Sequence, residues 1–147
     1  MMELTRKGEY AIRAILYLSR QPRGKLSLVG EIAESAGIPR TFLSKILQQF
    51  TRTGLVASFR GMGGGFTLAR DPAGITLLEV VEAIEGPVLP NRCLVGEGTC
   101  ERDRICRVHE VWGRVRDEIV AILAGVTIEE LARGREGFAV DDLTRSR

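Results

Sequence analysis

The sequence predicts a mainly α-helical protein with one small β-hairpin, and three observations support this fold class. Apolar residues recur at three- and four-residue steps through most of the chain, which is the period of a helix with one buried face. Two short runs with strand character, 55–59 and 66–70, flank the glycine-rich sequence RGMGGG, as in a hairpin. The longest apolar pattern, over residues 108–123, lies near the C-terminus and predicts one long helix.

Charge is divided unevenly along a chain whose 147 residues suffice for one domain. Residues 1–70 hold 11 Lys/Arg against 4 Asp/Glu, a net charge of +7, whereas residues 71–147 hold 10 against 15, a net charge of −5. This division indicates that the basic half meets a polyanion, although two ordinarily solvated surfaces are the alternative. Because the sequence contains no secretory leader and no long apolar run, we expect a cytoplasmic protein with reduced thiols and no membrane partner.

The first three predicted helices form a helix–turn–helix. Thr5 is expected to cap helix 5–20, and Ser27 to cap helix 27–36. A turn at Gly37 and Pro39 leads into helix 39–53, which combines one apolar stripe with a face that carries cations and amides but no acid. Such a second helix is typical of one that enters the DNA major groove. Its candidate DNA-binding residues are Arg40, Thr41, Ser44, Lys45 and Gln48.

The hairpin that follows is predicted to be a wing. Arg60 and the glycines Gly61, Gly63 and Gly64 form its tip, which could approach a phosphate backbone closely while Arg60 enters the minor groove. No phosphate-binding lysine motif follows and no βαβ unit surrounds the tip, so a nucleotide-binding loop is not expected. The alternative is a turn that is merely flexible. Helix 76–85, opened by a Thr-x-x-Glu capping box, is expected to brace the wing against the first helix.

All three cysteines and the single histidine of the chain lie between residues 93 and 109, with the spacing C-x6-C-x5-C-x2-H. Thiolates and imidazole together suit zinc, copper(I) or iron–sulfur chemistry better than calcium or magnesium. An odd number of cysteines also argues against a disulfide framework. The sequence therefore predicts a metal site formed by Cys93, Cys100, Cys106 and His109.

A helical pattern resumes near residue 104 and carries one long apolar seam that includes Val111, Trp112 and Ile119. So small a domain offers little to cover this seam, which favours pairing with a second copy of the chain, although Trp112 could equally be a core residue. A second Thr-x-x-Glu capping box, at Thr127, opens a short helix to Arg133. The polar tail beyond it is expected to fray.

Three segments together resemble a known family: MELTRKGEYAIRA at the start, RGMGGGFTLAR at the wing, and the three cysteines ahead of the long helix. With TLLEVVEAIEGP between wing and cysteines, the resemblance covers about residues 2–132. The family is the Rrf-two family of bacterial winged helix–turn–helix regulators, and the chain is most similar in pattern to its IscR-like, iron–sulfur cluster members. The resemblance implies a homodimer swapped across its long helices, a palindromic DNA operator, and one iron–sulfur cluster per subunit. It implies a repressor that senses iron–sulfur, redox or nitric-oxide status.

Cys93, Cys100 and Cys106 match the family's three cysteine ligands, although the first interval is six residues here and usually five in IscR-like members. His109 matches the fourth ligand of IscR-like proteins, and positions i and i+3 share a helix face. Other members take a carboxylate from the partner's first helix, at the position that Glu9 occupies here. We favour His109 and a 2Fe-2S cluster, with Glu9 and a 4Fe-4S cluster as alternatives. Thr41, Ser44, Lys45 and Arg60 occupy positions that contact the operator in IscR-like members.

This assignment divides the chain into a winged helix–turn–helix DNA-binding domain (1–86), a cysteine-rich cluster-binding loop (87–109), a dimerisation helix with a short terminal helix (104–133) and a polar tail (134–147). Two other interpretations stay open at this point. One is a structural zinc site in a DNA-binding protein, since Cys3His is a tetrahedral zinc set. The other is a cluster-free, cysteine-redox or metabolite-responsive regulator or interaction module. An enzyme is not expected, because no carboxylate–histidine–nucleophile set and no nucleotide fingerprint is present.

Overall fold

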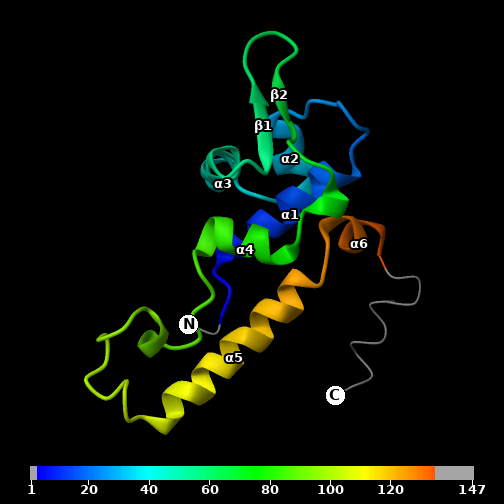
Figure 1. Ribbon diagram of the computed structural model, residues 1–147. Coiled ribbons are helices and arrows are strands. Elements are labelled where there is room, and N and C mark those ends of the chain that lie inside the picture. Colours follow the sequence, from blue (N-terminus) through cyan, green and yellow to red (C-terminus); the bar gives the residue numbers. More distant parts are fainter. Residues whose placement is uncertain (1–2, 135–147) are drawn as a thin grey trace, which may run out of the picture.

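The computed structural model describes residues 3–134 and has the predicted architecture, helices with one two-stranded antiparallel hairpin. The helices and strands of this part of the chain follow one another as labelled in Figure 1. They are α1 (Arg6–Arg20), α2 (Val29–Ala36), α3 (Arg40–Arg52), β1 (Val56–Phe59), β2 (Gly65–Leu68), the 3-10 helix η1 (Pro72–Gly74), α4 (Leu77–Glu85), the 3-10 helix η2 (Arg92–Leu94), α5 (Arg107–Ala124) and α6 (Ile128–Arg133).

The first three helices pack around one hydrophobic core. Thr5 caps α1 as expected, because its side-chain oxygen accepts from the Gly8 N–H at 3.1 Å. The predicted apolar stripe of α3 is fully buried in this core. Side chains from α1 to α4, the hairpin and α6 complete it. The core consists of Ala11, Ala14, Ile15, Leu18, Ile32, Ala33, Ile38, Leu43, Ile46, Leu47, Phe50, Leu55, Val56, Ile75, Val80 and Ile128.

The hairpin β1–β2 projects from this core, with Val56 paired to Leu68 at its base and Phe59 to Gly65 near its tip. Ser27 extends the hairpin by an antiparallel bridge to Phe66, in which each backbone N–H donates to the other residue's carbonyl, at 2.9 and 2.8 Å. The expectation that Ser27 caps α2 is therefore wrong. Its extended backbone is held by the wing, and Leu28 is the N-cap, without a side-chain hydrogen bond.

Both predicted capping boxes are present, and they lie side by side. Thr76 caps α4 and Thr127 caps α6, each reciprocated by the glutamate three residues later. The two threonines form an antiparallel bridge, in which Leu77 N–H donates to Val126 O and Ile128 N–H donates to Ile75 O, both at 2.9 Å. This bridge returns the chain from α5 to the winged domain, where α6 packs on α1 and contributes Ile128 to the core.

An ion pair links the end of the wing to α4, as the predicted brace requires. An Arg70 guanidinium nitrogen lies 2.8 Å from Glu79 Oε1, and Glu79 Oε2 accepts from the Thr76 N–H at 3.0 Å. Although partial burial opposes ionisation of Glu79, the Thr76 N–H and the Arg70 charge together hold the pKa of its carboxyl below the ordinary value. The same carboxylate thus serves the cap of α4 and the anchor of the wing.

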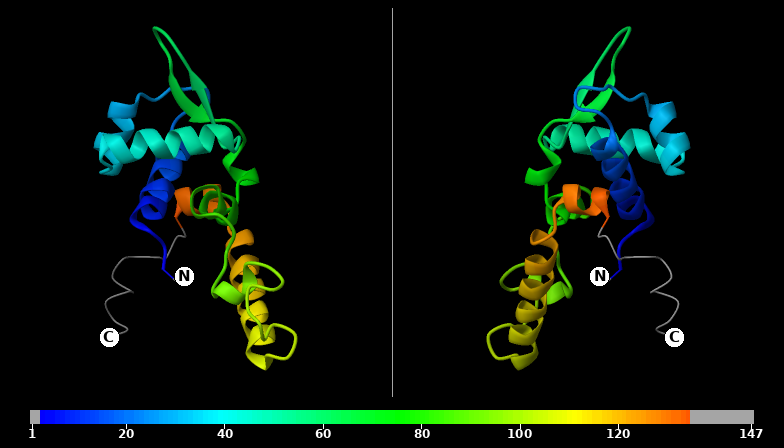
Figure 2. Two further views of the ribbon diagram at one scale, coloured as in Figure 1. Left: turned by 90° about the vertical axis from the view of Figure 1, so that its left-hand side faces the viewer. Right: turned by 90° about the vertical axis from the view of Figure 1, so that its right-hand side faces the viewer.

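α5 extends away from the winged domain as an arm that carries the cysteine loop (Figures 1 and 2). It begins at Arg107 rather than near residue 104, because the preceding residues form a turn in which Cys106 N–H donates to Arg102 O at 2.8 Å. None of its residues is buried. None of the helices in residues 3–134 is long and apolar enough to cross a membrane. Most of the predicted tail, 135–147, lies outside the described residues.

Candidate DNA interface and cysteine loop

The exposed face of α3 carries every polar residue that the sequence predicted for it. The buried stripe fixes the rotation of the helix, so the opposite face is held toward solvent. Arg40 lies back against α2, where a Cβ added at Gly30 would stand 2.7 Å from its Nη2 atom. The exposed residues on this face are Arg40, Thr41, Ser44, Lys45 and Gln48.

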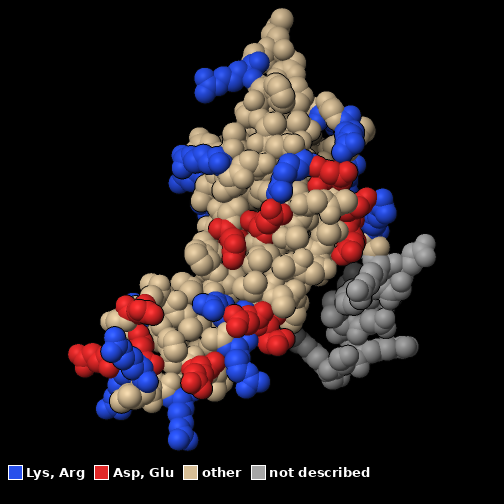
Figure 3. All heavy atoms as spheres, viewed as in Figure 1, with Lys and Arg blue, Asp and Glu red and all other residues tan. Residues whose placement is uncertain are grey.

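The wing tip presents Arg60 to solvent beside a turn that only glycines can form. Gly61 and Gly63 have φ angles of 92° and 75°. A Cβ added at Gly64 would lie 2.3 Å from the Phe59 carbonyl oxygen. The turn conformation by itself therefore requires glycine at these positions, whatever the tip contacts. Figure 3 shows the Lys and Arg side chains of this face over α3 and the hairpin, with acidic side chains lower, over α4.

The four candidate metal ligands lie on three successive pieces of the loop. Cys93 is half-buried in η2, Cys100 is exposed in the loop, and Cys106 is half-buried as the N-cap of α5. His109 lies in the first turn of α5, where its N–H donates to Cys106 O at 3.1 Å. All three thiols are free.

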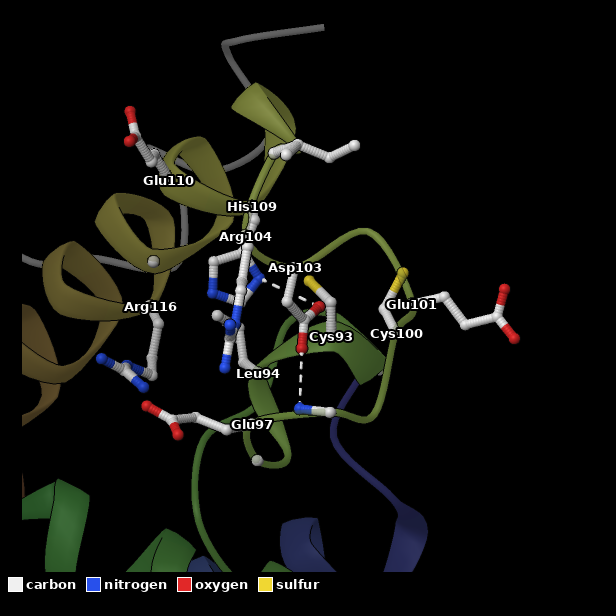
Figure 4. A pocket seen from close by; sticks show the side chains of 14 residues that line it. Cys93, Leu94, Glu97, Cys100, Glu101, Asp103, Arg104, His109, Glu110 and Arg116 are labelled. Carbon is white, nitrogen blue, oxygen red and sulfur yellow. Dashed lines mark hydrogen bonds and ion pairs between the residues drawn. The ribbon is translucent and has the colours of Figure 1, made fainter.

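A pocket of about 700 Å³ separates the loop from α5, and Cys93, Cys100 and His109 line it together with Asp103 (Figure 4). The His109 Nδ1 atom lies 3.8 Å from Asp103 Oδ1. Both atoms are shielded from solvent and neither has a hydrogen-bond partner among the described residues. Buried polar atoms of this kind are normally satisfied, so the site favours a further ligand or a small closure of the loop.

The three thiols and the imidazole suit a thiophilic metal, but the conformation of the loop keeps these side chains apart. Within residues 3–134, no three Cys, His, Asp or Glu side chains are close enough together to hold one metal ion. Cys106 does not line the pocket that Cys93, Cys100 and His109 share. Ligation by all four residues therefore requires the loop to contract. Glu9, the alternative fourth ligand, is exposed on α1.

The sequence interpretation missed Asp103. Nothing in the spacing distinguishes it from the neighbouring acids Glu97 and Glu101, because its partners come together only when the loop folds. Asp103 Oδ2 accepts from the Gly98 N–H at 3.1 Å, while Oδ1 faces His109. No signal in the sequence therefore singled out this acid.

A solvent-exposed cationic helix next to a glycine-tipped hairpin defines a winged helix–turn–helix DNA-binding protein. The chain belongs to the Rrf-two (Rrf2) family, whose model, described as an iron-dependent transcriptional regulator, matches residues 4–134. Curated relatives include the HTH-type transcriptional regulator IscR of Cronobacter sakazakii, 33% identical over 141 residues, covering 96% of this chain and 86% of the relative. IscR of Escherichia coli O1:K1 is 33% identical over 135 residues, covering 92% and 83%.

Solved structures agree with this family. CymR, described as the global cysteine regulator of B. subtilis, has a TM-score of 0.72 and 28% identity, covering 90% of this chain and 98% of CymR. IscR of T. potens has a TM-score of 0.73 at 24% identity, covering 94% and 92%, and supports the fold. The chain is a transcriptional regulator, like these relatives, and not an enzyme.

Proposed function

We propose that the protein is a cytoplasmic repressor that senses iron–sulfur, redox or nitric-oxide status through a cluster held by the cysteine loop. The observation that carries the proposal is the shared pocket of Cys93, Cys100 and His109, at the foot of a helix that leads back to a DNA-binding domain. The similarity to IscR supports the same conclusion.

Cys93, Cys100, Cys106 and His109 are the proposed ligands, with the partner subunit's Glu9 as the alternative to His109. A 2Fe-2S cluster is favoured over a 4Fe-4S cluster because His109 matches the fourth ligand of the IscR-like members that the chain resembles. When bound, such a cluster supplies a centre that reacts with oxidants and nitric oxide. The loop residues would hold the cluster. Because His109 lies in the first turn of α5, loss of the cluster would directly affect the start of that helix.

The proposed DNA target is a palindromic operator, contacted by α3 and the wing tip of each subunit. Arg40, Lys45 and Arg60 are exposed and supply the cations for phosphate and groove contacts. Thr41, Ser44 and Gln48 on the same face are suited to base edges, and the Gly61, Gly63 and Gly64 backbone can approach the phosphates. Two-fold symmetry places the half-sites about one helical turn apart, so a footprint without a dyad would contradict this geometry.

We propose a homodimer paired through α5, because apolar side chains of this helix are exposed to solvent in the single chain. Val108, Val111 and Ile122 are exposed at 57%, 55% and 66%, although they belong to the apolar seam. An apolar pocket of about 690 Å³ beside the helix is lined by Leu4, Ile12, Val81, Ile119 and Leu123, among others. A second copy that lays its own α5 against this surface would bury both.

The loop and the winged domain are joined by a short structural path. α5 (Arg107–Ala124) carries His109 in its first turn, and after its C-cap at Gly125 the Thr76–Thr127 bridge ties the chain to the start of α4. Glu79, in the first turn of α4, pairs with Arg70 at the end of the wing. A change at the loop that moves α5 would therefore reach the wing, and a differential affinity of roughly 1–3 kcal/mol between two forms suffices for a switch.

Anaerobic purification with iron supplied tests the proposal. We expect a coloured protein with visible charge-transfer absorption and about two iron atoms per chain, as a 2Fe-2S cluster requires. His109→Ala should change the Mössbauer and absorption spectra, while Glu9→Ala leaves them unchanged. The reverse result would assign the fourth ligand to Glu9. A colourless protein would contradict the cluster proposal. One zinc ion per chain without iron would establish a structural zinc site instead.

A second candidate function is a cluster-free regulator that responds to cysteine redox state or a metabolite, or that recruits a partner protein. It is favoured by the 28% identity to CymR and by the open arrangement of the thiols. Cys100→Ser distinguishes the two, because Cys100 is a proposed ligand and is also the exposed cysteine. An operator affinity that is unchanged by this substitution under all redox conditions, in a metal-free protein, would favour a metabolite-responsive regulator or a module that recruits a partner protein. Loss of a redox response in the same metal-free protein would favour a cysteine-redox regulator.

A further inference from the structure

Asp103 occupies the centre of the cysteine loop. Its backbone N–H donates to Cys100 O at 3.2 Å, so it closes the turn that follows the second cysteine. Its side chain is only 15% exposed, although most neighbouring loop residues are exposed. Through Oδ2 it accepts the Gly98 N–H at 3.1 Å, which fastens the segment ahead of Cys100. The carboxylate is therefore held by the loop and is not a freely solvated acid.

The second carboxylate oxygen of Asp103 faces His109. Oδ1 and the imidazole Nδ1 atom lie 3.8 Å apart, as the dashed line in Figure 4 marks. Both atoms are buried and have no other hydrogen-bond partner among the described residues. A hydrogen bond between them needs a closure of only about 1 Å. Since an unsatisfied buried donor or acceptor costs free energy, each atom favours the other as its partner.

An ionised carboxylate accepts hydrogen bonds and donates none. Its partner nitrogen on a neutral imidazole must therefore carry the proton. We infer that Asp103 is a positioning residue that holds His109 as the Nδ1–H tautomer and thereby leaves the Nε2 lone pair free to bind metal. Carboxylates that orient a ligating histidine in this way are common around metal sites. The metal-binding part of the inference rests on the proposed function, whereas the tautomer does not.

The alternative, in which Asp103 is itself a metal ligand, agrees less well with its contacts. One of its oxygens already holds the Gly98 N–H, and the other lies against the imidazole. The carboxylate thus lies between the loop and the first turn of α5, and it orients the His109 imidazole beside the pocket that Cys93 and Cys100 line before any metal binds. Preorganisation of this kind requires the carboxylate to stay on the imidazole.

The single histidine makes the tautomer directly measurable. Metal-free protein labelled with 15N-histidine gives one set of imidazole signals in a long-range 1H–15N correlation spectrum, recorded on the neutral form of the ring. We expect the Nδ1–H tautomer in the wild type. In Asp103→Asn the side-chain oxygen can still accept from Gly98, but the amide N–H donates to Nδ1, so the signals should switch to the Nε2–H tautomer.

A wild-type spectrum of the Nε2–H form, or an identical spectrum in the wild type and Asp103→Asn, would overturn the inference. Glu101→Gln is the matched control, because it removes one negative charge from an exposed loop residue with no hydrogen bond or ion pair among the described residues. This control should keep the wild-type tautomer. A switch in Glu101→Gln as well would assign the effect to loop charge and not to Asp103.

Titration with Co2+ alone, followed by visible absorption, tests the second part. Asp103→Asn should bind Co2+ about 10–100-fold more weakly than wild type, and Glu101→Gln about equally. Equal binding by Asp103→Asn would overturn the positioning role. If anaerobic preparations contain no cluster while the tautomer switches as expected, the proposed function fails and the Asp103–His109 pair stands. If the cluster forms normally and the tautomer does not switch, the inference fails alone.

Discussion

The winged domain and the arm of α5 and the cysteine loop use their apolar residues in opposite ways. Every core residue lies in residues 11–80 or is Ile128, which α6 returns to that domain. The arm also contains an apolar seam, along α5, yet α5 has no buried residue. The winged domain is therefore stabilised by its own core, whereas the arm exposes an apolar surface that no other part of the described chain covers.

This difference has a physical consequence for function. A domain with a closed core keeps α3 and the wing in a fixed relation, which reading a DNA groove requires. An arm without a core has few contacts that resist rearrangement, so ligation at the loop or pairing along α5 can reposition it at small cost.

Matched valine substitutions should separate the two regions most strongly. Val80 in α4 is fully buried and Val111 in α5 is 55% exposed, and both are helical, so Val→Ala changes helix propensity alike. Val80→Ala should lower the free energy of unfolding by about 1.5–3 kcal/mol. Val111→Ala should stay within about 0.5 kcal/mol in dilute monomer, and should weaken self-association at higher concentration. Denaturant unfolding at several protein concentrations measures both, and equal losses in dilute monomer would contradict the comparison.

Matched arginine substitutions test whether DNA binding belongs to the winged domain and not to the arm. Arg60→Ala at the wing should weaken operator binding by about 1–3 kcal/mol if the side chain enters a groove. Arg114→Ala removes the same charge from an exposed position on α5 and should leave the affinity unchanged. Fluorescence anisotropy at a fixed, moderate salt concentration measures both variants. An unaltered affinity for Arg60→Ala would remove this arginine from the interface.

The two capping boxes test whether α6 belongs to the winged domain. Thr76→Ala and Thr127→Ala should each cost about 1 kcal/mol, since each removes a side-chain acceptor at a helix N-terminus. Serine at either position keeps the acceptor and should recover most of the loss. Both alanine variants should lower the same thermal transition, because the Thr76–Thr127 bridge joins the two helices. A separate transition affected by Thr127→Ala alone would place α6 with the arm.

The smallest effect is expected from the carboxylate that links wing and α4. Glu79→Gln should change stability at neutral pH by less than about 1 kcal/mol, because the pair with Arg70 is 40–44% exposed and screened. The folded-state pKa of Glu79 is lowered, so its contribution is present above the ordinary value of 4.5 and is lost as the pH falls through the lower folded value. Wild type and variant should therefore converge in acid, by thermal unfolding across pH. A difference that grows in acid would reverse the assigned sign.

Much of the fold was predictable because its signals are local. The caps at Thr5, Thr76 and Thr127 and the buried stripe of α3 each depend on residues within one or two helical turns. Ser27 shows where local reasoning fails. As a residue type it is a good N-cap, but Phe66, far along the chain, takes both of its backbone hydrogen-bonding groups. The later start of α5 has a local cause instead, because a turn from Arg102 to Cys106 precedes the helix.

The candidate site divides in the same way. The residue types and order of Cys93, Cys100, Cys106 and His109 predict a thiophilic metal, since ligand chemistry follows from side-chain identity. Their separation across η2, an open loop and the first turn of α5 could not be read from spacing. Loop geometry depends on contacts such as Gly98 with Asp103, which form only in the folded chain.

Local patterns in the sequence therefore predict the class of protein, the exposed polar face of α3 and a candidate ligand set in the loop. Periodicity, capping and side-chain chemistry are properties of neighbouring residues. Three features instead depend on long-range or loop contacts: the place of Ser27 beside the wing, the return of α6 to the winged domain, and the position of Asp103 opposite His109. Each of these depends on residues that approach one another because the core closes between them, and no local pattern encodes such an approach.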